Sequence, residues 1–139
     1  TKTPKVTSPD VETVKSMLNA LGTEVYLERE EEIDMATALS GTGPSYIFLI
    51  MEALVDAGVH LGFPRRVATQ LVLQTVKGSV EFALQSQAHL AELRNQVTSP
   101  GGTSAEAIYQ MEKGGVRTVI SKSVWWAFKK SLSLSKLAQ

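Results

Sequence analysis

The stretch PSYIFLIMEALVDAGVHL, residues 44–61, decides the fold of this chain. Pro44 suits the first turn of a helix, and the residues after it are apolar on nearly every side except at Glu52 and Asp56. A helix that is apolar all round belongs inside a protein. The apolar run Tyr46–Val55 contains Glu52 and is too short and too charged to span a bilayer. We therefore expect a buried helix and no membrane partner.

Helical patterns surround this stretch on both sides. Apolar spacing and Pro or Gly breaks predict six further helices, over residues 9–20, 30–40, 64–86, 90–96, 103–113 and 116–134. Ser8 and Pro9 are predicted to be the N-cap and the first residue of the first helix. Gly41 and Gly43 are expected to form a tight corner between two helices. From residue 30 onward the chain is therefore predicted to be helical.

One segment near the N-terminus has a strand pattern instead. Residues Thr23–Glu28 (TEVYLE) alternate, with β-branched and aromatic members. The sequence offers no second good strand, and an isolated strand is not stable. The predicted fold class is all-α, with one short strand whose partners lie outside this chain.

The last predicted helix carries more apolar residues than one core can take up. Adjacent helical residues point about 100° apart, so Trp125 and Trp126 cannot both face one narrow core. Together with the all-round apolar helix, this predicts an interface with a second chain. An unusually apolar monomer surface is the alternative.

Composition excludes several classes of function. Fourteen basic and fourteen acidic residues cancel, so no overall field favours nucleic acid. A small basic cluster is interpreted as a solvated helix face and comprises Lys122, Lys129, Lys130 and Lys136. The absence of cysteine excludes disulfides and thiol chemistry, and it is compatible with the reducing cytoplasm, where we expect this protein. Residues 1–10 are polar, so no signal peptide is expected.

Common catalytic motifs are missing. His60 and His89 have no acidic partner at ligand spacing, so no metal site is expected and both are interpreted as helix-end or loop residues. The hydrolase pattern Gly-x-Ser-x-Gly does not occur. Gly41-Thr42-Gly43 has Tyr46 in place of the third glycine of a dinucleotide fingerprint and follows a predicted helix. The acidic residues 28–34 are interpreted as a solvated first turn.

The stretch TSPGGTSAEA, residues 98–107, could bind an anion. Its Pro-Gly-Gly turn leaves backbone N–H groups unshielded, and Thr103 with Glu106 matches a capping box at a helix start. Such a helix start favours negative charge. Hydroxyl groups flank the turn at Ser99, Thr103 and Ser104. A plain helix start without a ligand is the alternative explanation of this loop taken alone.

Two segments in this order resemble a known enzyme family. They are ALSGTGPSYIFLIMEALVDAGVHLGFPRRVA (38–68) and HLAELRNQVTSPGGTSAEAIYQMEKGGVR (89–117). They resemble the C-terminal domain of Δ1-pyrroline-5-carboxylate reductases, over roughly Glu30 to Gln139. The resemblance implies an intertwined helical dimerisation domain, similar to that of 6-phosphogluconate dehydrogenase-like enzymes. It assigns residues 1–28 to a remnant of the N-terminal Rossmann domain and linker, and 29–139 to dimerisation and substrate binding.

The same resemblance implies a reaction and a set of site residues. Members of the family reduce 1-pyrroline-5-carboxylate to L-proline with NADPH or NADH, as homodimers or larger assemblies. The residues implied to bind the substrate are Ser99, Gly101, Gly102, Thr103 and Ser104. Ser104 is also implied to be catalytic, by donating a hydrogen bond to the ring nitrogen. The cofactor would be held mainly by the absent N-terminal domain, so this chain alone is expected to be inactive.

Four departures from the family pattern stand beside this resemblance. Ser104 replaces a threonine, Leu90 a proline and Asn95 an aspartate, while Trp125-Trp126 replaces small residues and is expected to alter dimer packing. Two other functions stay open. One is a self-standing oligomerisation or small-anion-binding module without redox activity, and the other is a related imine or hydroxyacid reductase.

Overall fold

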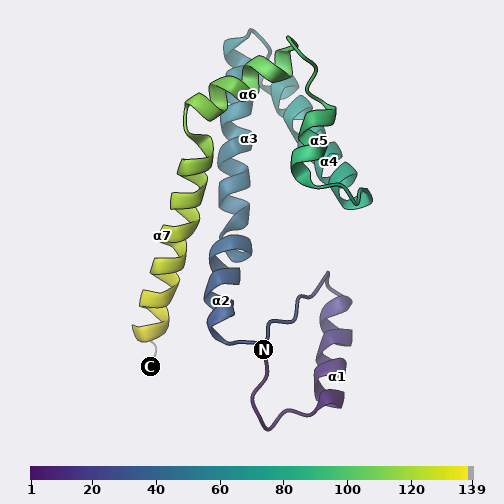
Figure 1. The fold of residues 1–139 in the computed structure, drawn as a ribbon, viewed down its shortest axis with the longest axis vertical. Helices are drawn as coiled ribbons and strands as arrows, with labels where there is room; N and C mark the ends of the chain where they lie inside the picture. Colours follow the sequence, from purple (N-terminus) through teal and green to yellow (C-terminus); the bar gives the residue numbers. More distant parts are fainter. Residues whose placement is uncertain (138–139) are drawn as a thin grey trace. The chain divides into compact units, whose positions relative to one another are not determined.

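The computed structural model describes residues 1–137, so the last two residues of the expected domain 29–139 lie outside the described residues. The elements are α1 (Ser8–Asn19), α2 (Glu31–Ala36), the π-helical turn η1 (Thr37–Gly41), α3 (Gly43–His60), α4 (Arg65–Gln85), α5 (Leu90–Gln96), α6 (Thr103–Lys113) and α7 (Val116–Leu137) (Figure 1). The all-α prediction is confirmed, with α7 three residues longer than expected. The chain forms two compact units, one of residues 1–42 with the chain from Val124 onward and one of Gly43–Ser123.

Helix α1 begins one residue earlier than the sequence predicts. Thr7, not Ser8, is the N-cap, and it forms a capping box with Asp10. The Thr7 hydroxyl and backbone N–H both donate to the Asp10 carboxylate, at 2.5 and 2.9 Å. The prediction of Ser8 as the cap is wrong because Thr7 has the partner three residues on that a capping box requires. These bonds, the side-chain bond foremost, lower the pKa of Asp10.

The start of α1 is therefore expected to depend on pH. A carboxyl whose pKa is lowered by folding stabilises the folded state above its ordinary pKa of about 3.9, and this contribution is lost as pH falls through the lowered pKa. Backbone chemical shifts of α1, followed by NMR during an acid titration, should show its first turn fraying in acid. In the Asp10→Asn variant that acid transition should be absent, and an unchanged transition would contradict this role.

The strand expected over Thr23–Glu28 is not formed within the described residues. Residues 23–27 have no regular secondary structure, and no strand occurs anywhere in residues 1–137. A strand exists through hydrogen bonds to a neighbouring strand, and these residues have none to pair with. The alternating pattern alone is therefore insufficient, as the lack of a second strand candidate already indicated.

The corner predicted at Gly41 and Gly43 is also absent. Residues Thr37–Gly41 form a π-helical turn, in which the Thr42 backbone N–H donates to the Thr37 carbonyl at 2.8 Å. The Thr42 hydroxyl donates to the same carbonyl at 2.9 Å. Thr42 is itself in the right-handed helical region, and neither glycine has positive φ. The wider turn accommodates Pro44, which lacks an N–H group, without a break into a loop.

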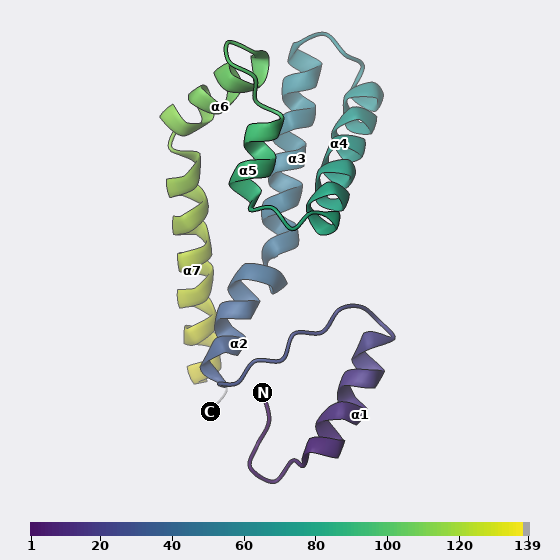
Figure 2. The same ribbon diagram turned by 45° about the vertical axis from the view of Figure 1, so that its right-hand side comes forward.

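Helices α3 and α4 form an antiparallel pair within the second unit (Figure 2). Val55 of α3 and Ala68 of α4 are buried. A Cβ placed on Gly58 would lie only 2.9 Å from the Ala68 methyl carbon, so glycine allows the two backbones to approach. An ion pair of 2.7 Å between Asp56 and Arg65 links the two helices near the turn that connects them.

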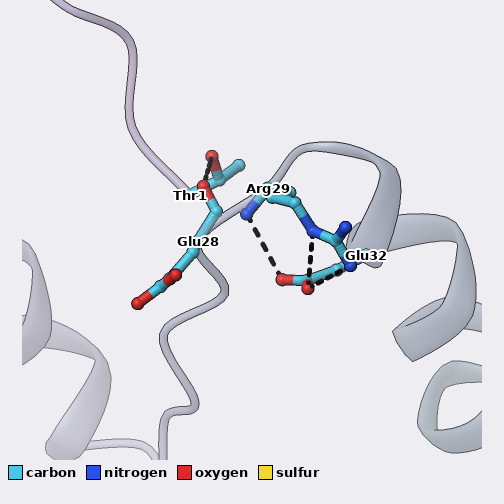
Figure 3. A network of polar contacts seen from close by, with 4 residues as sticks. All are labelled: Thr1, Glu28, Arg29 and Glu32. Atoms are coloured by element: carbon cyan, nitrogen blue, oxygen red, sulfur yellow. Dashed lines mark hydrogen bonds and ion pairs between the residues drawn. The ribbon is translucent and has the colours of Figure 1, made fainter.

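In the first unit, α2 and α7 lie side by side (Figures 1 and 2). The Ser131 and Ser135 hydroxyls of α7 donate to Asp34 of α2, at 2.5 and 3.2 Å. Asp34 therefore joins two helices and is not merely part of a solvated first turn. Glu32 accepts from the Arg29 backbone N–H at 3.2 Å and from its guanidinium at 2.9 Å (Figure 3). These bonds, the backbone one foremost, lower the pKa of Glu32.

The structure leaves most large apolar side chains uncovered. Among the described residues, the buried hydrophobic ones are Ala38, Val55, Ala68 and Leu93. Both Trp125 and Trp126 are exposed, at 54 % and 70 %. The whole helical stretch Glu31–His60, which is longer than the apolar run Tyr46–Val55, is long and apolar enough to cross a membrane, a test that core helices of soluble proteins also pass. The π turn joins α2 to α3, so the helical stretch is longer than its apolar run. Many of the apolar side chains on this stretch are exposed in the single chain.

Candidate functional site

The candidate site is the loop between α5 and α6, which lies within the second unit (Figure 2). Helix α5 begins after His89, whose Nδ1 accepts a hydrogen bond from the Ala91 backbone N–H at 3.1 Å. Leu93 is buried and anchors this short helix. The chain leaves α5 at Val97 and enters α6 at Thr103, as predicted. His60 is the last residue of α3, so both histidines lie at helix ends as interpreted from the sequence.

A tight turn shapes the middle of the loop. The Gly102 backbone N–H donates to the Ser99 carbonyl at 3.0 Å, and Gly101 has φ of +70°. Proline in the second position and a residue of positive φ in the third are the signature of a type II turn. Only glycine adopts this φ without strain, so Pro100 and Gly101 have separate, definite roles in the turn.

Gly102 permits a close approach to Ser99. A Cβ on Gly102 would overlap the Ser99 hydroxyl oxygen and lie 3.2 Å from the Ser99 carbonyl oxygen. Any larger residue would therefore displace the Ser99 side chain. The Gly102 N–H is already used within the turn, which corrects the expectation that it is free to bind a ligand. Gly102 contributes space rather than a donor.

The start of α6 differs in detail from the capping box that the sequence suggests. Gly102 is the N-cap and no side chain caps the helix, so Thr103 is the first helical residue. Glu106 instead accepts from the Gln110 side chain at 2.7 Å. The turn bond between Gly102 and Ser99 draws Gly102 into the cap position and moves Thr103 one place along. The predicted capping pair is therefore wrong, although the helix start is right.

Two backbone donors remain available at this helix end. Within residues 1–137, no backbone carbonyl accepts from the N–H groups of Thr103 and Ser104. The first N–H groups of a helix point along its axis, where the helix dipole favours an anion. Ser99, Gly101 and Thr103 are exposed, and Ser104 is half-buried. The loop thus brings all five sequence-predicted site residues together, with the unpaired amides of Thr103 and Ser104 and three hydroxyl groups among them.

Sequence reasoning missed the residue that attaches this loop to α5. The Thr98 hydroxyl donates to the Arg94 carbonyl at 2.7 Å, in a half-buried position. Its backbone N–H donates to the Asn95 carbonyl at 3.0 Å. The Asn95 side-chain oxygen accepts from the Arg94 guanidinium at 3.2 Å, so this departure from the family pattern keeps a polar partner. In the sequence, the only sign of Thr98 is that it is one of several hydroxyl residues around the turn.

The described residues do not form a dinucleotide-binding cradle. Such a cradle needs a glycine-rich turn between a strand and a helix. Residues 1–137 contain no strand, and Gly41 and Gly43 are part of helical backbone. A cleft of about 730 Å³ lies in the N-terminal segment between α1 and residues 21–26, but no residue of the candidate loop lines it. Within the same described range, no group of three or more His, Asp or Glu residues could hold a metal.

Comparison with known proteins agrees with the described fold. Residues 30–134 match the family model of pyrroline-5-carboxylate reductase dimerisation. The pyrroline-5-carboxylate reductases of Pseudomonas aeruginosa and Synechocystis are each 39 % identical, over 95 % of this chain and 48 % or 49 % of their own length. The chain thus spans about half the length of these curated relatives.

Two solved structures are similar as well. One is a pyrroline-5-carboxylate reductase from Coxiella burnetii, with a TM-score of 0.91 at 37 % identity over 95 % of this chain and 49 % of that one. The other is the Plasmodium falciparum pyrroline carboxylate reductase with NADP bound, with a TM-score of 0.85 at 38 % identity. The match covers 93 % of this chain and 49 % of the Plasmodium falciparum chain.

Proposed function

This chain belongs to the pyrroline-5-carboxylate reductase family and carries its dimerisation domain, and we propose that its Ser-Pro-Gly-Gly loop binds the substrate carboxylate. The longer protein would reduce 1-pyrroline-5-carboxylate to L-proline with NADPH or NADH. The free amides at the start of α6, beside the Ser99 hydroxyl, are the observation that carries this proposal. A carboxylate is the anion of the family's substrate, and it fits donors of this kind.

The division of labour follows from what the chain holds. Since no dinucleotide cradle occurs in the described residues, we propose that the cofactor is held mainly by parts of the longer protein outside this chain. Residues 1–28 would be a remnant of that cofactor-binding domain and its linker, and residues 29–139 would dimerise and bind substrate. This chain by itself would then be inactive.

The role of this loop in the reaction is to position the substrate and to donate a hydrogen bond. In the substrate, the carboxylate is attached to the ring carbon next to the imine nitrogen. A carboxylate held by Ser99 and the amides of Thr103 and Ser104 therefore brings the nitrogen close to the Ser104 hydroxyl. A hydrogen bond to that nitrogen makes the imine carbon more electrophilic. Fixing one end of the substrate also sets the face that is open to attack.

The direct test is the Ser99→Ala variant of the full-length protein. A hydrogen bond to a charged group contributes about 1.5–3 kcal/mol, so KM for pyrroline-5-carboxylate should rise about tenfold or more, with a smaller change in kcat. Ser79→Ala is the matched control, because the exposed Ser79 hydroxyl donates only to the Thr75 carbonyl of its own helix. An unchanged KM in Ser99→Ala would show that this loop does not bind the substrate carboxylate.

The same preparation separates the alternatives. A full-length protein that reduces no pyrroline-5-carboxylate, while this chain still dimerises, would favour a binding or oligomerisation module. Activity with another cyclic imine or with a hydroxyacid, but not with pyrroline-5-carboxylate, would favour a related reductase.

A further inference from the structure

Among the described residues, Thr98 is the one whose side chain joins the candidate loop to the preceding helix. Its hydroxyl donates to the Arg94 carbonyl at 2.7 Å, and its own backbone N–H donates to the Asn95 carbonyl at 3.0 Å. Both acceptors belong to the last turn of α5, where the Arg94 carbonyl also accepts from the Val97 backbone N–H at 3.3 Å. Thr98 thus adds one hydrogen bond to each of two carbonyls of this turn, and the pair of bonds sets the direction in which the chain leaves α5.

The next residue in the chain is Ser99, which is constrained from its other side as well. Its carbonyl accepts from the Gly102 N–H at 3.0 Å, and its side chain rests where a Cβ of residue 102 would be. The position of the Ser99 hydroxyl is thus constrained on both sides, by the hydrogen bonds of Thr98 before it and by the glycine turn after it. The glycine turn fixes only the conformation within the loop. Without the Thr98 anchor, the loop as a whole could pivot about residue 98.

We infer that Thr98 is a positioning residue for substrate binding, acting through the Ser99 hydroxyl. This inference rests on the proposed function, because it requires that Ser99 contacts the carboxylate. Thr98 itself is half-buried with its hydroxyl committed to Arg94, so it does not touch substrate. Without the anchor, the Ser99 hydroxyl samples more positions, and each productive binding event must order it again.

The test compares Thr98→Val with Thr98→Ser in the full-length protein. Valine keeps the shape and loses the donor, so KM for pyrroline-5-carboxylate should rise about 3- to 10-fold with kcat within about twofold of wild type. Serine keeps the donor, so both constants should stay within about twofold. Thr118→Val is the control, because Thr118 is exposed on α7, outside the loop.

A double variant distinguishes positioning from a general loss of stability. Since Thr98 acts through Ser99, adding Thr98→Val to Ser99→Ala should raise KM no further than Ser99→Ala does alone. An additive rise, or a Thr98→Val variant with wild-type KM, overturns the inference. If Ser99→Ala alone leaves KM unchanged, the proposed function fails first. Melting temperatures show whether Thr98→Val is folded at the assay temperature. If it is not, Thr98→Ala replaces it, and failure of both variants to fold overturns the inference in favour of a structural role.

Discussion

Replacing Ser104 by alanine is expected to lower kcat of the full-length protein by about 10²-fold, with a much smaller change in KM. Removing one donor that strengthens its bond during the chemical step typically costs a factor of this order. Ser104 is the second residue of α6 and is half-buried, and no group in residues 1–137 accepts a hydrogen bond from its hydroxyl. The hydroxyl is therefore available to the substrate rather than engaged by the protein.

The matched variant for this prediction is Ser104→Thr. Threonine is the residue that the family pattern has here, and it keeps the hydroxyl while its methyl group restricts the rotamer. We expect it to match or exceed the wild-type kcat. Steady-state kinetics with pyrroline-5-carboxylate and saturating reduced cofactor make the measurement. A Ser104→Ala protein that turns over at the wild-type rate would show that another group serves the ring nitrogen.

The second large effect is expected from Leu49→Asp on α3, which should raise the dimer dissociation constant by about 10³-fold. Leu49 is 66 % exposed in the single chain, and Phe48 beside it is equally exposed. Leu49 lies about 120° around α3 from Val55, the buried residue of this helix. It therefore belongs to the side of α3 that its own unit leaves uncovered, which a dimer of this family would bury.

The size of this effect follows from the cost of burying charge. An unpaired carboxylate taken out of water costs several kcal/mol, and twofold symmetry places two of them in each dimer. Two penalties of this size sum to at least about 4 kcal/mol, which gives the predicted factor as a minimum. Gln70→Asp is the control, because Gln70 is an exposed polar residue of α4 and the same charge there should change little. Sedimentation velocity at several concentrations compares the two, and a Leu49→Asp protein that remains dimeric would move the interface off this face of α3.

Local chemistry made much of this fold predictable. Pro64, the Pro-Gly-Gly turn and the Gly114-Gly115 pair interrupt the helical pattern, and α4, α5 and α6 begin and end within one residue of the predicted limits. A proline lacks an N–H group and a glycine lacks a Cβ, so each acts on its own neighbours whatever surrounds it. The turn that carries the five proposed site residues was predictable for the same reason, since they lie within six consecutive positions.

Features that depend on which other residues come into contact could not be predicted in this way. Thr23–Glu28 has the alternation of a strand, but a strand forms only when another strand accepts its hydrogen bonds. Asp34 carries the charge expected of a first helical turn, and only folding brings Ser131 and Ser135 to it. The N–H of Gly102 could have served a ligand, but in the folded loop it bonds to Ser99.

By itself, then, the sequence determined most of the helices, most of their breaks and the position of the anion-binding candidate, because these depend on residues a few positions apart. The tertiary structure alone decided which donors remain free, where the chain passes from α2 to α3 through a π turn, and how Thr98 ties the loop to α5. It also showed how much apolar surface stays uncovered. These features depend on which atoms meet, and each hydrogen bond made within the chain removes a donor from the site.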